Sequence, residues 1–379
     1  MSDSPYILYG MSASLYTGKA RAYLIHHGVP FIERGAGHPQ FTQEIVPQIG
    51  RWIIPVLVTP GGHIIQDGAD IIDYLDAQGF SRNPVIPAGP LLRAVSHLFE
   101  LFGGEGLLRP AMHYRWNFDS DNLDFLRVNF SEAFPPGLDA AQQSAMFDHS
   151  SGRMRKAGNA FGVSADTAPA IEASYAVCLS LLEAHFSQSY YLLGGHPTLG
   201  DYGLMNGLYA HLSRDPHPSM IMKRRAPRVF AWTERMNRHG RDDHNIAGAP
   251  DGLFTALPGT LIALMQFIAA DFLPEMTAHT AFINDWLAAQ DSIPAGPMER
   301  ILGFAAFDWH GQPIKTAVMP YRSWLIQRLQ DHYDGCIPED RARIDALFND
   351  TGLSALLTER LTRRVERAGN REVWGASSA

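Results

Sequence analysis

Short apolar runs alternate with helical patterns through residues 1–80, and this alternation constrains the fold more than any other feature. Residues 16–27 and 69–77 place apolar side chains at helical spacing, and a looser stretch near 41–46 allows a short helix. Pro60-Gly61-Gly62 separates the last two apolar runs and predicts a tight antiparallel hairpin. The predicted order is therefore βαβαββα, a small sheet with helices on its faces, whose strands lie at 6–9, 29–33, 53–58 and 63–65.

This order of elements resembles the thioredoxin fold. Pro55 stands at the start of a strand that should be central in the sheet, where a proline removes a donor of the hydrogen-bond ladder. A proline in that place indicates a special local geometry, such as a cis peptide bond.

The rest of the chain is mainly helical. A linker rich in Pro and Gly covers 79–90, and Thr198 with Asp201 forms a capping-box pattern at the start of a helix. We predict three regions: a thioredoxin-like domain over 1–80, an all-helical domain over 91–250, and a mainly helical extension over 251–379. The predicted helices cover 91–108, 121–130, 170–186, 261–272, 280–288, 321–333, 339–348 and 353–368, with a long insertion at 134–168 and a hairpin at 302–318.

Composition excludes several classes of protein. With 46% hydrophobic and 18% charged residues, the chain has enough apolar surface to fold, so extensive disorder is excluded. The net charge of −8 argues against a general nucleic-acid binder. Cys178 and Cys336 are far apart, the histidines show no metal-binding spacing, and residues 1–5 do not resemble a signal peptide. We therefore expect no metal, no membrane span and a cytoplasmic location.

Three segments, in register, carry a resemblance to a known family. The first runs from Leu8 to Arg21, the second joins Ile53-Ile54-Pro55-Val56-Leu57 to residues 65–75, and the third is Gly194-Gly195-His196-Pro197-Thr198-Leu199-Gly200-Asp201. Together they resemble the glutathione S-transferase superfamily over about residues 5–240. The resemblance implies a thioredoxin-like domain followed by a helical domain, with glutathione as co-substrate.

The same resemblance assigns the candidate catalytic residues. Ser14 begins the segment that carries the active-site Ser or Cys in relatives, where its hydroxyl would donate to the glutathione sulfur. The dipole of the following helix would favour the same thiolate. Ser12 and Tyr16 offer alternative hydroxyls, Tyr9 is more consistent with core packing, and an ordinary N-cap is the structural alternative for Ser14.

The candidate glutathione-binding residues follow from the other segments. Pro55 resembles the cis-proline of the family, so Ile54 would present its main chain to the cysteinyl part. Asp67 would accept the γ-glutamyl ammonium, or simply cap the next helix. Gly68 departs from the family pattern because it lacks the serine hydroxyl, leaving only its N–H for the γ-glutamyl carboxylate. Arg51 could contact the glycyl carboxylate.

We therefore predict a glutathione transferase-like enzyme whose bound thiolate attacks a small hydrophobic electrophile held between the domains. The polar and aromatic cluster at 112–116 is a candidate part of that pocket, with a packed turn carrying surface charge as the structural alternative. A non-catalytic binding protein of the same fold is the first alternative, and a glutathione-dependent isomerase or dehalogenase is the second. A homodimer is the habit of the family, although the extension could cover that surface. A C-terminal segment filling the glutathione pocket would exclude the chemistry but not the fold.

Overall fold

A computed structural model describes residues 5–239 and 246–377, and it confirms the predicted thioredoxin-like sheet. The strands follow the order β2-β1-β3-β4, with β1 parallel to β2 and antiparallel to β3, and β3 antiparallel to β4. The helices α1 and α3 share the main hydrophobic core with the helical domain. The elements are β1 (Tyr6–Gly10), α1 (Leu15–His26), β2 (Phe31–Gly35), η1 (Phe41–Ile45), α2 (Val46–Ile49), β3 (Val56–Val58), β4 (Ile64–Gln66) and α3 (Gly68–Ala77).

A helical domain follows, and α9 lies at its centre with every residue buried. Glycine lets α9 approach α4 closely, because a Cβ on Gly203 would lie 2.4 Å from the Glu100 Cα. Asp201 caps α9 by accepting the Thr198 N–H at 2.8 Å, as the capping-box pattern predicts. The domain comprises α4 (Pro90–Leu101), η2 (Phe102–Gly106), α5 (Leu108–Trp116), α6 (Asp119–Ser131), α7 (Ala140–Ala160), α8 (Ala168–His185), α9 (Leu199–Gly207), η3 (Leu208–Ser213), α10 (Pro216–Arg225) and α11 (Pro227–Met236).

The long insertion predicted at 134–168 contains the 21-residue helix α7, which was not predicted from the sequence. Asp139 and Gln142 form a reciprocal capping box that starts the helix. Only Phe147, Ser151 and Gly158 are buried along its length. A helix with so narrow a buried face leaves almost no apolar periodicity in the sequence.

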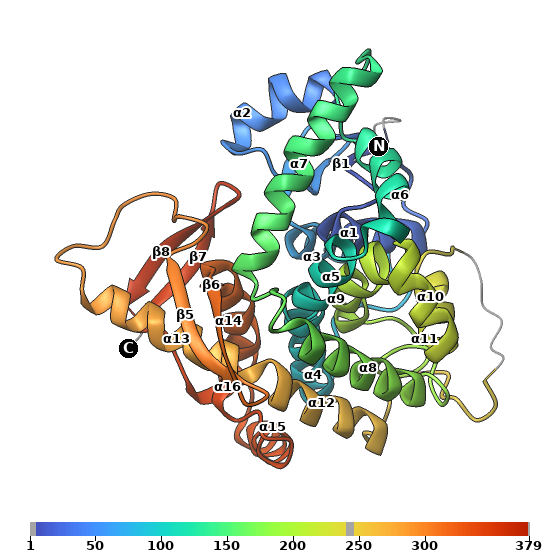
Figure 1. The fold of residues 1–379 in the computed structure, drawn as a ribbon. Coiled ribbons are helices and arrows are strands. Elements are labelled where there is room, and N and C mark those ends of the chain that lie inside the picture. The colour runs from blue at the N-terminus through green and yellow to red at the C-terminus, as the bar shows by residue number, and fades with distance from the viewer. Residues whose placement is uncertain (1–4, 240–245, 378–379) are drawn as a thin grey trace.

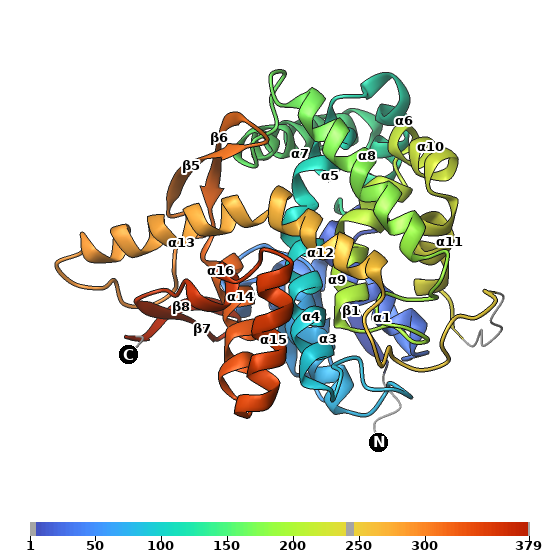
Figure 2. The same ribbon diagram turned by 90° about the horizontal axis from the view of Figure 1, so that it is seen from below.

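The extension packs on one side of the helical domain, with α14 beside α4 (Figures 1 and 2). The predicted hairpin at 302–318 is present as β5 and β6. The main apolar core continues from the helical domain into the extension through Leu264 and Leu325. The extension comprises α12 (Gly259–Asp271), α13 (Leu273–Ala288), β5 (Gly303–Trp309), β6 (Gln312–Val318), α14 (Pro320–Asp334), α15 (Pro338–Asp350), α16 (Ala355–Thr358), β7 (Arg363–Ala368) and β8 (Arg371–Ser377).

The helix predicted at 353–368 was wrong, because α16 ends at Thr358 and residues 363–377 form a second hairpin. Gly369 and Asn370 both have positive φ, the requirement of a tight hairpin turn. Arg364, in the first strand of this hairpin, pairs with Asp331 of α14 at 2.7 Å. This arginine therefore lies on a strand and binds a neighbouring helix.

A buried ionic network joins the extension to the helical domain. Arg322 of α14 donates from Nε to Glu105 Oε2 at 2.9 Å and from Nη1 to Glu275 Oε1 at 2.5 Å. Arg109 of α5 donates to the second oxygen of Glu275 at 2.6 Å. Burial raises the pKa of Glu275, but the two arginines outweigh it and bring the pKa to about 2. Glu275 is therefore ionised at neutral pH.

Among the described residues, no single helix is long and apolar enough to cross a membrane. Only the bent pair of α12 and α13 reaches the necessary length and composition, and it does so jointly.

We expect Arg322→Met to lower the free energy of unfolding by about 3–5 kcal/mol, because it removes the arginine that pairs with buried Glu105 and one of the two that pair with Glu275. Arg343→Met is the matched control, since Arg343 is exposed and its contact with Asp340 is 3.8 Å long. The control should change stability by less than about 1 kcal/mol. Urea denaturation measures both variants, and equal losses would contradict a special role for the network.

Candidate functional site

Ser14 lies between β1 and α1, where it caps the helix. Its Oγ accepts a hydrogen bond from Thr17 N at 3.3 Å. Arg115 of α5 holds the preceding residue by donating to the Ala13 carbonyl at 2.6 Å, and Asp215 anchors that arginine at 2.6 Å. Within the described residues, the Ser14 hydroxyl donates no hydrogen bond, so its proton is available to a ligand.

The other predicted hydroxyls have protein partners. Ser12 donates to Glu132 Oε2 at 2.6 Å, which ties the loop to α6. Tyr16 donates to Glu105 at 3.3 Å, and burial raises the pKa of its phenol above the ordinary value. Tyr9 packs in a buried cluster and donates to Gln40 at 2.7 Å. Ser14 is therefore the hydroxyl in this group best placed to act on a ligand.

The Ile54–Pro55 peptide bond is cis. Ile54 is half-buried, and no hydrogen bond to its main chain is found among the described residues. The Pro55 carbonyl accepts from Asp67 N at 3.3 Å, which links this loop to the start of α3. Hydrogen bonds from the described residues therefore leave the main chain of Ile54 unpaired.

Asp67 and Gly68 form the start of α3. Asp67 has φ of 97° and caps the helix through Ala69 N at 2.8 Å, and it also accepts the Tyr321 hydroxyl at 2.9 Å. Gly68 is the first helical residue, so its N–H has no partner within the helix. A Cβ there would lie 3.2 Å from the Lys19 side chain, which makes a serine at this position tight.

The C-terminal hairpin already engages Arg51, the predicted partner of a glycyl carboxylate. Arg51 donates to Glu372 at 3.1 Å, to the Asn370 carbonyl at 2.9 Å and to Gln66 Oε1 at 2.7 Å. Burial raises the pKa of Glu372, but Arg367 and Arg51 outweigh it and hold the pKa below its usual range. The carboxylate that occupies Arg51 in the structure therefore comes from the chain itself.

Besides Glu372, three residues of the extension reach the candidate site, and none of them was predicted from the sequence. Tyr321 binds Asp67, and Asn370 accepts the N–H of Gln66 at 3.1 Å, at the free edge of β4. Arg367 binds Asp70 at 2.8 Å and the Gln66 carbonyl at 3.0 Å. The turn pair Gly369-Asn370 was a signal for a hairpin here, but nothing in the sequence indicated where the hairpin would dock.

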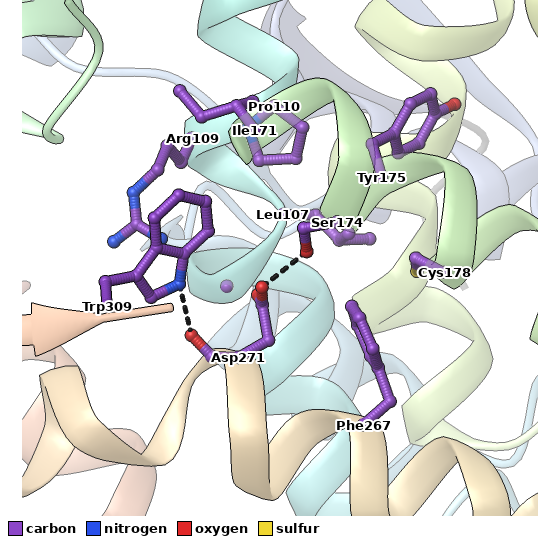
Figure 3. Close-up of a pocket in the computed structure, with 11 residues that line it drawn as sticks. Leu107, Arg109, Pro110, Ile171, Ser174, Tyr175, Cys178, Phe267, Asp271 and Trp309 are labelled. Atoms are coloured by element: carbon purple, nitrogen blue, oxygen red, sulfur yellow. Dashed lines mark hydrogen bonds between the residues drawn. The ribbon is translucent and has the colours of Figure 1, made fainter. Parts of the chain in front are cut away.

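A small internal cavity lies elsewhere, between α5, α8, α12 and β5 (Figure 3). Its volume is about 10 Å³, enough for one water molecule, and none of the predicted site residues lines it. Cys178 faces this cavity, and burial raises its pKa well above the ordinary value, so the thiol is protonated. In the described part of the chain, no group of three or more His, Cys, Asp or Glu side chains is arranged to hold a metal ion.

Comparison with known proteins agrees with this geometry. Residues 8–82 match the family model described as "Glutathione S-transferase, N-terminal domain". This part of the chain is a glutathione S-transferase N-terminal domain. It contains every candidate residue that the sequence analysis assigned, from Ser12 to Gly68. No curated protein matched the chain.

Solved glutathione S-transferases resemble the chain at low identity. The β-etherase LigF of Sphingobium sp. strain SYK-6 is 19% identical with a TM-score of 0.42, covering 62% of this chain and 95% of that one. GSTFuA3 of Phanerochaete chrysosporium is 19% identical with a TM-score of 0.43, covering 62% and 96%. A Ceriporiopsis subvermispora enzyme, crystallised in complex with glutathione, is 18% identical with a TM-score of 0.36, covering 61% and 95%.

We expect Asn370→Gly to loosen the hairpin from the transferase-type domain. Glycine keeps the left-handed turn conformation but removes the side-chain acceptor of the Gln66 N–H. Hydrogen exchange of the Gln66 amide should become about fivefold faster, because the loss of one hydrogen bond costs about 1 kcal/mol. His310→Gly, at the turn of the other hairpin, should leave that exchange rate unchanged, and an unchanged rate in Asn370→Gly would contradict the docking.

Proposed function

We propose that the chain binds glutathione on its N-terminal domain and promotes attack of the glutathione thiolate on a small hydrophobic electrophile. The observation that carries the proposal is the Ser14 hydroxyl, which donates no hydrogen bond to a described residue. It lies at the start of α1, in a domain that matches the transferase family. The unpaired main chain of Ile54 supports it, because an extended ligand could pair there.

In this proposal each group has a separate task. Ser14 donates its proton to the sulfur, and the dipole of α1 adds positive potential at the same point. Both favour the thiolate, and a pKa lowered by one unit corresponds to about 1.4 kcal/mol. Ile54 aligns the cysteinyl main chain, Asp67 accepts the γ-glutamyl ammonium, and the Gly68 N–H donates to the γ-glutamyl carboxylate.

Arg51 needs a different assignment from the predicted one. Its partners in the structure are Glu372, Asn370 and Gln66, so we propose that it holds the C-terminal hairpin rather than the glycyl carboxylate. Arg51 is already paired with a carboxylate of the chain itself, which also favours the second candidate function, a binding protein of this fold without turnover.

The homodimer and the cytoplasmic location stay proposals. The extension packs on α4 and binds α3 through Arg328 and Asp73 at 2.6 Å, so a dimer would have to use other surfaces of these domains. Light scattering of the purified chain gives the mass in solution.

Glutathione titration separates the two candidate functions. We expect millimolar glutathione to raise the melting temperature, because a ligand that binds only the folded state stabilises it. We also expect turnover of a chloronitrobenzene-type electrophile. Stabilisation without turnover, or no response in either assay, would contradict the transferase and favour the non-catalytic binding or interaction protein.

Two substitutions separate catalysis by Ser14 from helix capping. Ser14→Ala removes both the cap and the hydroxyl donor, and we expect a stability loss of about 1 kcal/mol together with loss of turnover. Ser14→Asp keeps a good cap but places a negative charge beside the thiolate, so turnover should fall while stability is preserved. Full turnover in Ser14→Asp would leave Ser14 with only the structural role.

Tyr321→Phe tests whether the extension positions the glutathione site. It removes the hydroxyl that holds Asp67. We expect KM for glutathione to rise about tenfold, the scale of one hydrogen bond to a charged group, with little change in kcat. Tyr333→Phe is the matched control, because its hydroxyl binds Asp345 at an exposed position of the same helix. An equal rise of KM in both variants would contradict the positioning role.

A further inference from the structure

A second pocket lies on the helical domain, and none of its lining residues belongs to the transferase-type N-terminal domain. Its volume is about 140 Å³, close to the roughly 150 Å³ of an apolar cavity that holds benzene. The pocket is thus large enough for one aromatic ring. It lies between α5, α8 and α10, and its lining includes Tyr114, Phe118, Glu172, Tyr175, His217 and Arg225.

Three aromatic rings that line this pocket also pack on one another. The rings of Phe118 and His217 stack at 3.7 Å with 15° between their planes. Tyr114 and Phe118 lie 5.6 Å apart with 18° between their planes. An aromatic lining of this kind offers apolar surface against which the ring of a ligand can pack.

Two opposite charges line the same pocket. The Glu172 carboxylate receives one hydrogen bond, from His113 Nε2 at 3.0 Å, which leaves its second oxygen open. Arg225 has no ion pair or hydrogen bond with any residue that the structure describes. Burial raises the pKa of Tyr114, Glu172 raises it further and Arg225 lowers it, so both charges act on this one ring.

We propose that this pocket binds a small aromatic zwitterion, of the aromatic α-amino acid class. The ring packs against Tyr114 and Phe118, the ammonium pairs with Glu172, and the carboxylate pairs with Arg225. The site is independent of the proposed glutathione site.

Three single-ring probes test the proposal on the full chain. We expect L-phenylalanine to bind with one-to-one stoichiometry in a calorimetric titration. Benzoate lacks the ammonium and benzylamine lacks the carboxylate, so each should bind about tenfold more weakly. Equal affinity of either probe and L-phenylalanine would overturn the zwitterion assignment, and absence of binding by all three would overturn the site.

Matched variants then locate the binding. Arg225→Gln should weaken L-phenylalanine binding about tenfold. Arg224→Gln, an exposed neighbour outside the pocket lining, should leave the affinity unchanged. Equal effects of Arg225→Gln and Arg224→Gln would overturn the location.

Discussion

The buried pairing of Arg322 with Glu105 and Glu275 is the interaction on which the assembly of this molecule depends. Glu105 also accepts the Tyr16 hydroxyl, so one short network connects α14 of the extension to α1 of the N-terminal domain. Charges removed from water are stable only when every partner is in place, so this network ties the three regions of the chain together.

The same logic applies at the candidate site, which depends on contacts from outside its own domain. Arg115 of the helical domain fixes the Ala13 carbonyl beside Ser14. Tyr321 of the extension fixes Asp67, and Asn370 fills the free edge of β4. The hydroxyl and main-chain donors proposed for glutathione lie on the transferase-type domain, but their placement requires the rest of the chain.

Two candidate glutathione-binding positions differ from what the family pattern implies. Gly68 lacks the serine hydroxyl, and Lys19 leaves little room for a larger side chain there. Arg51 lies under the C-terminal hairpin and pairs with Glu372. The family pattern implies a serine hydroxyl for the γ-glutamyl carboxylate of glutathione and Arg51 for its glycyl carboxylate. At this site both carboxylates would need other partners.

The sequence by itself determined the local elements of this protein: the βαβαββα order, the capping of α9 by Asp201, and the β5–β6 hairpin. Each depends on residues close together in the chain, where periodicity, glycine turns and capping side chains act directly. It did not reveal α7, whose narrow buried face gives little periodicity. Only the tertiary structure decided that Tyr321, Arg367 and Asn370 reach residues 66–70, because contacts across some 300 residues leave no spacing pattern in a single sequence.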